Sequence, residues 1–173
     1  MPGSLNDLLP EPLSQESEAI LDELIKRKVR SAAGLAVDLL HAMEERFGPE
    51  ARQVVREMAQ RQFAPSPNPG APQADLRQFC SDLDHACIGS HRWEQVIDEP
   101  DRIGYHYTRC LWAEVFRELD EPELGYIFCA GDEPAVKACN PKLGFRRTQV
   151  LMLGDPLCDH IFLVEKQDEQ NTP

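Results

Sequence analysis

Apolar residues in the first half of the chain recur at steps of three and four, which predicts helices that each bury one face. The longest pattern covers residues 14–47. Gly48 and Pro49 then end that helix and start a second one, which reaches about residue 63, because Gly favours a helix end and Pro a first helical turn. A third, shorter helix is predicted over residues 75–84. The N-terminal half is therefore expected to be helical.

Beyond this half the period changes to the alternation of β-strands. Four segments alternate and pair into two hairpins, 93–97 with 103–108 and 145–153 with 159–165. Helices are predicted between the hairpins, over 111–119 and over 122–139, the second interrupted near Gly131. This order indicates an α+β fold, in which N-terminal helices pack on an antiparallel sheet of about four strands.

The domain organisation follows from length and from the placement of Pro and polar residues. A chain of 173 residues suits one domain, which we expect over residues 14–166. Residues 1–13 contain three prolines and predict a flexible arm, and residues 64–73 predict a Pro-rich loop. Residues 167–173 predict a polar tail.

Charge and composition exclude several classes of partner. A formal net charge of −12 and a pI near 4.8 argue against binding to nucleic acid or to an anionic membrane. We find no signal peptide and no apolar run long enough to span a bilayer, so we expect a cytoplasmic location with reduced thiols. The six cysteines include no C-x-x-C pair, which argues against a zinc ribbon or a thioredoxin-type motif.

Two pairs of thiol and carboxylate in the last third of the chain could carry chemistry. Cys110 begins a predicted helix, where free N–H groups lower a thiol pKa, and Glu114 follows four residues later. Cys129 and Asp132 are three apart on another predicted helix and would share a face. A thiol with a neighbouring carboxylate could form a nucleophile and its base. The alternative is a core cysteine beside a solvated acid.

A third pair lies on the last predicted strand. Cys158 and His160 alternate there, so both side chains leave the same side of the sheet and could be a nucleophile and base or two metal ligands. Guanidinium groups that could grip a carboxylate occur at Arg109, Arg146 and Arg147. Among the other histidines, His41, His85 and His91 are interpreted as surface or packing residues.

The blocks that hold these residues resemble a known family. R-C-L-W-A-E-V-F-R-E-L, E-L-G-Y-I-F-C-A-G-D, N-P-K-L, R-R-T-Q-V-L-M-L-G-D and C-D-H-I-F are similar, in this order, to the L-2-amino-thiazoline-4-carboxylic acid hydrolase family. The resemblance covers the last third of the chain. It implies a bacterial cytoplasmic hydrolase that opens a small cyclic amidine-like ring and converts the thiazoline to N-carbamoyl-cysteine.

Under this hypothesis we assign catalytic roles to Cys129, Cys110, Asp132, His160, Cys158 and Glu114. A cysteine thiolate would attack the ring or lie next to the activated water, the aspartate would hold the amidinium or act as base, and the histidine would move the proton. The substrate-binding candidates are Arg147, Asn140 and Thr148.

Three alternatives accompany this hypothesis. No cofactor is expected, but a competing version holds zinc between Cys110, Cys129, Cys158 and His160 to activate water. A different class is a non-catalytic small-ligand binding or sensing domain of the vinyl-reductase type, with a similar α+β layout. The long first helix could also serve a homo-oligomer.

Overall fold

The computed structural model describes residues 6, 9–62 and 73–165. Its elements in chain order are α1 (Gln15–Phe47), α2 (Glu50–Gln62), α3 (Leu76–Cys87), β1 (His91–Glu99), β2 (Arg102–Cys110), α4 (Leu111–Glu118), α5 (Pro122–Cys129), α6 (Asp132–Cys139), β3 (Leu143–Arg146), the short 3-10 helix η2 (Leu151–Leu153) and β4 (Cys158–Val164). The predicted α+β class is confirmed. The Pro-rich loop, apart from its last residue, and the polar tail lie outside the described residues, as does most of the N-terminal arm.

The four strands form an antiparallel sheet in the order β1-β2-β4-β3. The last strand therefore lies inside the sheet, beside β2. Their register places Tyr105 opposite His160 and Tyr107 opposite Cys158. Because side chains alternate between the faces of a sheet, these four side chains leave from the same face.

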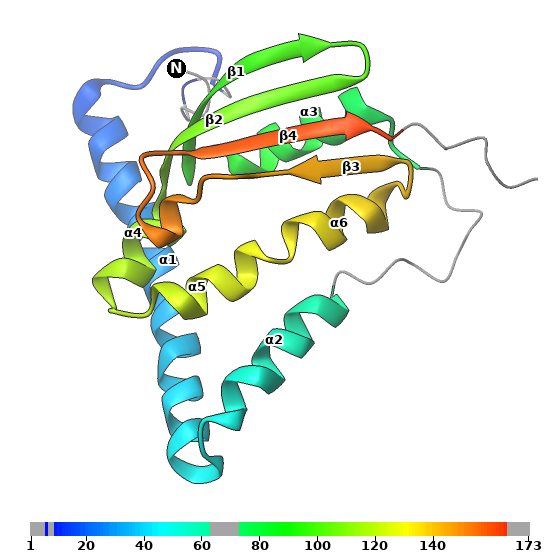
Figure 1. Cartoon of the computed structure of the whole chain (residues 1–173). Helices are drawn as coiled ribbons and strands as arrows, with labels where there is room; N and C mark the ends of the chain where they lie inside the picture. Colours follow the sequence, from blue (N-terminus) through cyan, green and yellow to red (C-terminus); the bar gives the residue numbers. More distant parts are fainter. Residues whose placement is uncertain (1–5, 7–8, 63–72, 166–173) are drawn as a thin grey trace, which may run out of the picture.

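That face of the sheet is the buried one. Ile103, Tyr105 and Tyr107 of β2 and Phe162 of β4 are each at most 3% exposed. Figure 1 shows α3, α5 and α6 on this side of the sheet, and no helix of the described chain covers the other side. The α+β layers thus leave one sheet face for an interior site.

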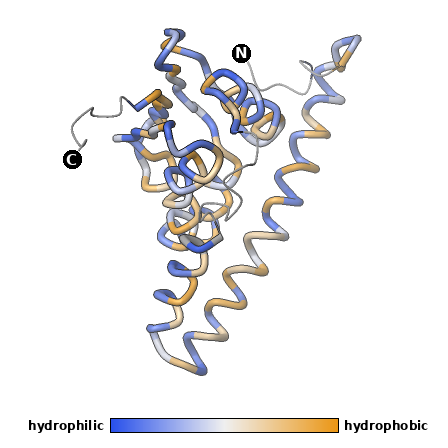
Figure 2. The backbone as a smooth tube through the Cα atoms, turned by 90° about the vertical axis from the view of Figure 1, so that its right-hand side faces the viewer, coloured by the Kyte–Doolittle hydropathy of each residue, from blue (hydrophilic) through white to orange (hydrophobic). Residues whose placement is uncertain are grey.

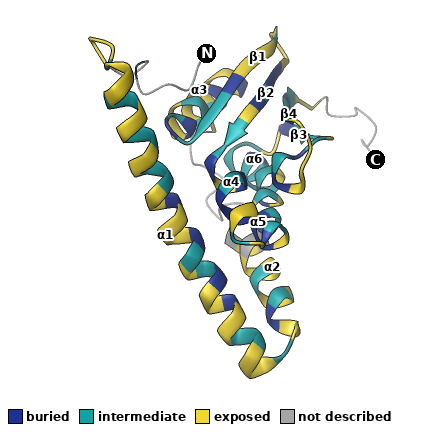
Figure 3. Cartoon of the chain, turned by 90° about the vertical axis from the view of Figure 1, so that its left-hand side faces the viewer, coloured by how far each residue is buried: buried dark blue, intermediate teal, exposed yellow. Residues whose placement is uncertain are grey.

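Helix α1 extends well beyond the sheet, and α2 folds back along α1 (Figure 1). The Ser14 hydroxyl caps the first turn by accepting the N–H of Ser17 at 3.2 Å, and Gly48 ends the helix with a φ of 86°. Apolar and polar residues alternate along α1 (Figure 2), and its buried residues form a narrow stripe (Figure 3). This stripe, with residues such as Ala33 and Leu40, packs α1 against the first core cluster.

Two hydrophobic clusters make up the core. One joins α1, α4, α5 and η2 through residues such as Ala33, Phe116 and Met152. The other joins the sheet to α3 and α6 through residues such as Tyr107 and Phe162. Cys158 and Leu151 pack against both clusters, so the two parts of the core meet at the start of β4.

The strand predicted over 145–153 exists and pairs with β4, but its predicted end at residue 153 is wrong, since β3 ends at Arg146. Two carboxylates explain why the ladder stops. Asp159 accepts the backbone N–H groups of Thr148 and Gln149 at 2.8 and 2.6 Å, and Asp155 accepts that of Val150 at 2.7 Å. Backbone donors held by side chains cannot join a strand partner. Arg147, the first residue of the resulting loop, bonds to Asp132 and to the carbonyl of Cys129.

Candidate functional site

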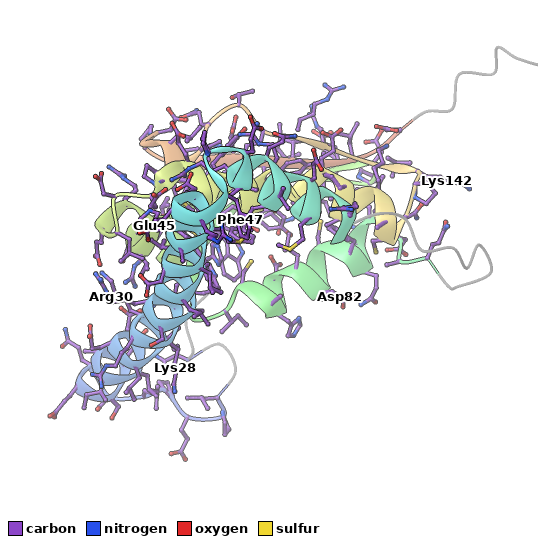
Figure 4. All side chains as sticks on the ribbon, turned by 90° about the horizontal axis from the view of Figure 1, so that it is seen from below. Lys28, Arg30, Glu45, Phe47, Asp82 and Lys142 are labelled. Atoms are coloured by element: carbon purple, nitrogen blue, oxygen red, sulfur yellow. The ribbon has the colours of Figure 1, made fainter. Side chains whose placement is uncertain are left out.

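A cavity of about 570 Å³ lies where the two core clusters meet. Its apolar walls come from α1, α3, α4, α5 and the sheet, through residues such as Ala33, Phe79 and Phe116. The view from below (Figure 4) shows side chains between α1, which carries Lys28 and Arg30, and α3, which carries Asp82. The cavity is of the size that binds small molecules.

Six of the nine predicted site residues line this cavity. They are Cys110, Cys129, Asp132, Arg147, Cys158 and His160. They arrive from separate elements: the junction of β2 and α4, the end of α5, the start of α6, the loop after β3, and β4. The expectation that Cys129 and Asp132 share one helix is wrong, because α5 ends at Cys129 and α6 begins at Asp132. Both side chains nevertheless reach the same space.

Glu114 does not belong to the cavity. It accepts a hydrogen bond from Nε of Arg109 at 2.7 Å and forms an ion pair with Lys26 at 3.4 Å. Arg109 also donates to Asp22 at 2.7 Å. This network holds α1 against the start of α4 and keeps the Glu114 carboxylate away from the cavity that the other candidates line.

Asn140 and Thr148 also lie outside the cavity lining. The Asn140 amide donates to the carbonyl of Ala74 at 2.9 Å, and its oxygen accepts the N–H of Lys142 at 2.9 Å. The Thr148 hydroxyl donates to Asp159 at 2.5 Å. These contacts fix the end of α6 and the loop after β3, so neither side chain is placed to bind a substrate there.

An ion pair forms the charged wall of the cavity. Arg147 donates to Oδ2 of Asp132 at 2.5 Å and to the carbonyl of Cys129 at 3.2 Å, and its guanidinium lies 5.5 Å from the Phe145 ring centre. The Arg147 side chain is 9% exposed and that of Asp132 40%. Burial raises the pKa of Asp132, and the Arg147 guanidinium acts against this rise.

The cavity thiols are protonated at neutral pH. Burial raises the pKa of Cys110 to about 11 and that of Cys129 to about 12, and it also raises the pKa of Cys158. Cys110 does precede the first turn of α4, and the N–H groups of Ala113 and Trp112 do lower its pKa. Their effect is smaller than that of burial, so the predicted low pKa of Cys110 is wrong.

The sheet wall supplies neutral hydrogen-bonding groups. Burial, with a further contribution from Arg147, lowers the pKa of His160 to about 3, and burial lowers that of His91 to about 4. His91 lines the cavity, which corrects its interpretation as a surface or packing residue. Tyr107 also lines it and was not singled out from the sequence. The sequence places Tyr107 two residues after Tyr105 on one predicted strand, so both side chains face the same side. It did not show which strand pairs with this one.

Within the described ranges, no group of three or more His, Cys, Asp or Glu residues is arranged to hold a metal ion. This includes the four residues of the zinc alternative. The same part of the chain contains no helix with the length and apolarity needed to cross a membrane.

Fold and site together define an α+β protein with an interior cavity of small-molecule size, walled by an ion pair, thiols and neutral imidazoles. The chain belongs to the L-2-amino-thiazoline-4-carboxylic acid hydrolase family, whose sequence profile matches residues 27–162. The family resemblance is therefore confirmed, and the match extends it through most of the helical half.

Other comparisons are more distant. No curated protein matches the chain significantly. Among solved structures, the chain is similar to the phenol-responsive sensory domain of the transcription activator PoxR, crystallised with phenol. The TM-score is 0.47 and the identity 16%, over 78% of this chain and 74% of that one.

Proposed function

We propose that this protein is a hydrolase that opens a small cyclic amidine carrying a carboxylate, of the 2-amino-thiazoline-4-carboxylate type. One observation carries the proposal: an arginine and an aspartate, paired at 2.5 Å, face one interior cavity. Such a substrate has a cationic amidinium and an anionic carboxylate. One oxygen of Asp132 would pair with the amidinium, which leaves the other free, and the fork of Arg147 would pair with the carboxylate of the substrate.

The protonation states favour attack by water over attack by a thiolate. The thiols of Cys110 and Cys129 keep their protons at neutral pH, because burial raises each pKa to about 11 and about 12. Asp132 has a raised pKa, which makes it a better base than an ordinary aspartate.

The reaction balances without a further reagent. Asp132 takes a proton from water, and the water oxygen bonds to the ring carbon between nitrogen and sulfur. The carbon–sulfur bond then breaks as the new hydroxyl becomes the carbonyl of the product and releases to solvent the proton that the amidinium had carried, and the departing sulfur takes up the proton from Asp132. The product is the open N-carbamoyl-cysteine, which differs from the substrate by one added water.

Chromatography of 2-amino-thiazoline-4-carboxylate incubated with the purified protein tests this proposal. The expected result is an N-carbamoyl-cysteine peak and a free thiol in equal amounts. Asp132→Asn should lower kcat by about 100-fold or more, the usual contribution of a general base. Arg147→Lys should mainly raise KM, since Lys lacks the bidentate fork.

Asp22→Asn is the matched control, because Asp22 is also an aspartate paired with an arginine, Arg109, but lies outside the cavity lining. Its kcat should stay near that of the wild type. Wild-type kcat in a folded Asp132→Asn variant would overturn the assigned base. If the purified protein contains stoichiometric zinc, and chelation removes both the zinc and the activity, then a metal and not Asp132 activates the water.

A second candidate function is non-catalytic ligand binding. The specific observation in its favour is that the cavity thiols are protonated and most of the wall is apolar, through residues such as Phe79, Phe116 and Phe162. A binding domain would show saturable ligand binding by calorimetry with no product in the chromatographic assay.

A further inference from the structure

Two buried polar atoms on the sheet wall of the cavity have no hydrogen-bond partner among the described residues. They are the hydroxyl of Tyr107 and Nε2 of His160. Tyr107 is only 2% exposed. The Cys87 thiol is close enough to affect the pKa of Tyr107 but does not reach hydrogen-bond geometry. Buried polar groups are rarely left unpaired, so each such atom requires an explanation.

These two atoms belong to one place in the cavity. Tyr107 on β2 is opposite Cys158 on β4, two residues before His160, and the Tyr107 and His160 rings are 4.7 Å apart. His91 lies edge-on to Tyr107 at 5.7 Å. We call Tyr107 and His160 the Tyr–His subsite. Since burial lowers the pKa of His160 to about 3, the subsite has no charge with which to hold an anion.

Aromatic rings continue from the subsite toward α3. His160 is 6.0 Å from Phe162, and Phe162 is 5.3 Å from Phe79 on α3. Phe79, Phe162 and His160 all line the cavity. A planar ring placed here would stack against aromatic faces and edges at ordinary distances.

The cavity is also too large for a single small ring. A five-membered ring with an amino group and a carboxylate has about nine non-hydrogen atoms. Even at the roughly 30 Å³ that liquid water gives each such atom, these would occupy ~270 Å³. The cavity offers about 570 Å³, within the range that holds drug-sized ligands. About half of its space would stay unfilled.

We infer that the substrate carries, beyond the reacting ring, an aromatic group with a neutral hydrogen-bonding substituent, and that the Tyr–His subsite binds that substituent. The inference concerns the same cavity and rests on the proposed function only for the reacting ring. A hydroxyl, carbonyl or amide would satisfy both Tyr107 and His160. The aromatic part would fill the space beside Phe79 and Phe162.

Binding of two matched probes tests the subsite without any turnover. 2-Naphthol and 2-methylnaphthalene have nearly the same shape, but only the first can hydrogen-bond. Isothermal titration calorimetry should give a Kd for 2-naphthol about 10-fold lower than for 2-methylnaphthalene. Equal affinities, or no binding of either probe by the folded wild-type protein, would overturn the inference.

Tyr107→Phe should remove most of the preference, leaving the two Kd values within about 3-fold, because the ring stays and only the hydroxyl is lost. Tyr105→Phe is the matched control. Tyr105 is also buried on β2, but its hydroxyl donates to Asp84 at 3.4 Å and it is not part of the cavity lining. The assignment would be contradicted if Tyr107→Phe kept the full difference between the two Kd values, or if Tyr105→Phe lost it.

The outcome is separable from that of the proposed function. Preference for 2-naphthol without turnover of the thiazoline would end the hydrolase proposal and keep the subsite. Turnover of the thiazoline with no difference between the probes would do the reverse.

Discussion

Cys110 lies at the start of a helix, a position that lowers a thiol pKa, and yet the pKa of Cys110 is raised. It precedes the first turn of α4, where backbone N–H groups stabilise a thiolate, but its side chain is also buried against the cavity. The free-energy cost of removing a thiolate from water is larger than the stabilisation that the helix start provides. Cys129 is also partly buried, and it ends helix α5 instead of starting a helix.

The cavity thiols should therefore react slowly with alkylating agents. At about pH 8, a pKa of about 11 leaves Cys110 with a thiolate fraction of roughly one in a thousand, and Cys129 with less. Iodoacetamide labelling followed by peptide mass spectrometry should show both cysteines reacting at least ~100-fold slower than the same residues in urea. A fast reaction at either cysteine near neutral pH would support the hypothesis that a thiolate is the nucleophile.

At the scale of elements, Gly125 decides how closely α5 can approach its neighbours. A Cβ at this position would lie 2.4 Å from the Met152 sulfur of η2 and 2.9 Å from the Phe116 ring of α4. Met152 and Phe116 both line the cavity. The close approach of α5 thus shapes the cavity wall and depends on a missing side chain.

Gly125→Ala should destabilise the protein by about 1–3 kcal/mol, as overpacking does. Gly34→Ala on α1 is the matched control, because a Cβ there has nothing within 4 Å. It should stabilise the protein by about 0.5–1 kcal/mol through helix propensity. Urea denaturation measures both, and equal effects of the two substitutions would contradict the packing argument.

At the scale of the whole molecule, a buried carboxylate joins three helices. Glu121, between α4 and α5, accepts hydrogen bonds from Arg52 of α2 at 2.8 and 2.9 Å and contacts His41 of α1 at 2.6 Å. The bonds from Arg52 are the main cause that lowers the pKa of Glu121 to about 2. The packing of α2 therefore depends on this charge as well as on apolar contacts.

Arg52→Gln should destabilise the protein by about 2 kcal/mol or more, since Glu121 would stay buried without its main partner. Adding Glu121→Gln should recover part of the loss. Arg77→Gln is the control, because the Arg77–Asp98 pair is about 60% exposed on both sides and such pairs contribute little. Thermal unfolding of the wild type and these three variants checks this, and similar losses in Arg52→Gln and Arg77→Gln would refute it.

The two cavity histidines make the stability of the fold depend on pH. Burial lowers the pKa of His91 to about 4 and that of His160 to about 3, so between about pH 6.5 and these values only the unfolded chain takes up their protons. The free energy of unfolding should fall as the pH is lowered through this window and should be fully present above it.

Urea titrations at about pH 7, 6 and 5 would measure this slope, above the range in which Glu121 titrates. His160→Gln should make the slope shallower. His85→Gln should not, because His85 is exposed. A slope that is unchanged in His160→Gln would contradict the assigned protonation.

Local patterns in the sequence were enough for most elements. The steps of three and four residues gave α1 to α3, and the alternation gave β1 and β2, because these periods follow from the geometry of single helices and strands. They also gave the α+β class. The pattern did not give the end of β3, where Asp155 and Asp159 take the backbone donors.

The site divides in the same way. The types of its residues, and the pairing of Cys158 with His160 on one strand face, could be read from the sequence, since alternation is a local property. The placement of β4 beside β2, which brings Tyr107 to His160, was decided only in the folded molecule. So were the inclusion of His91, the exclusion of Glu114 and the raised thiol pKa values. Burial and strand pairing join residues that are far apart in the chain, and no local pattern records them.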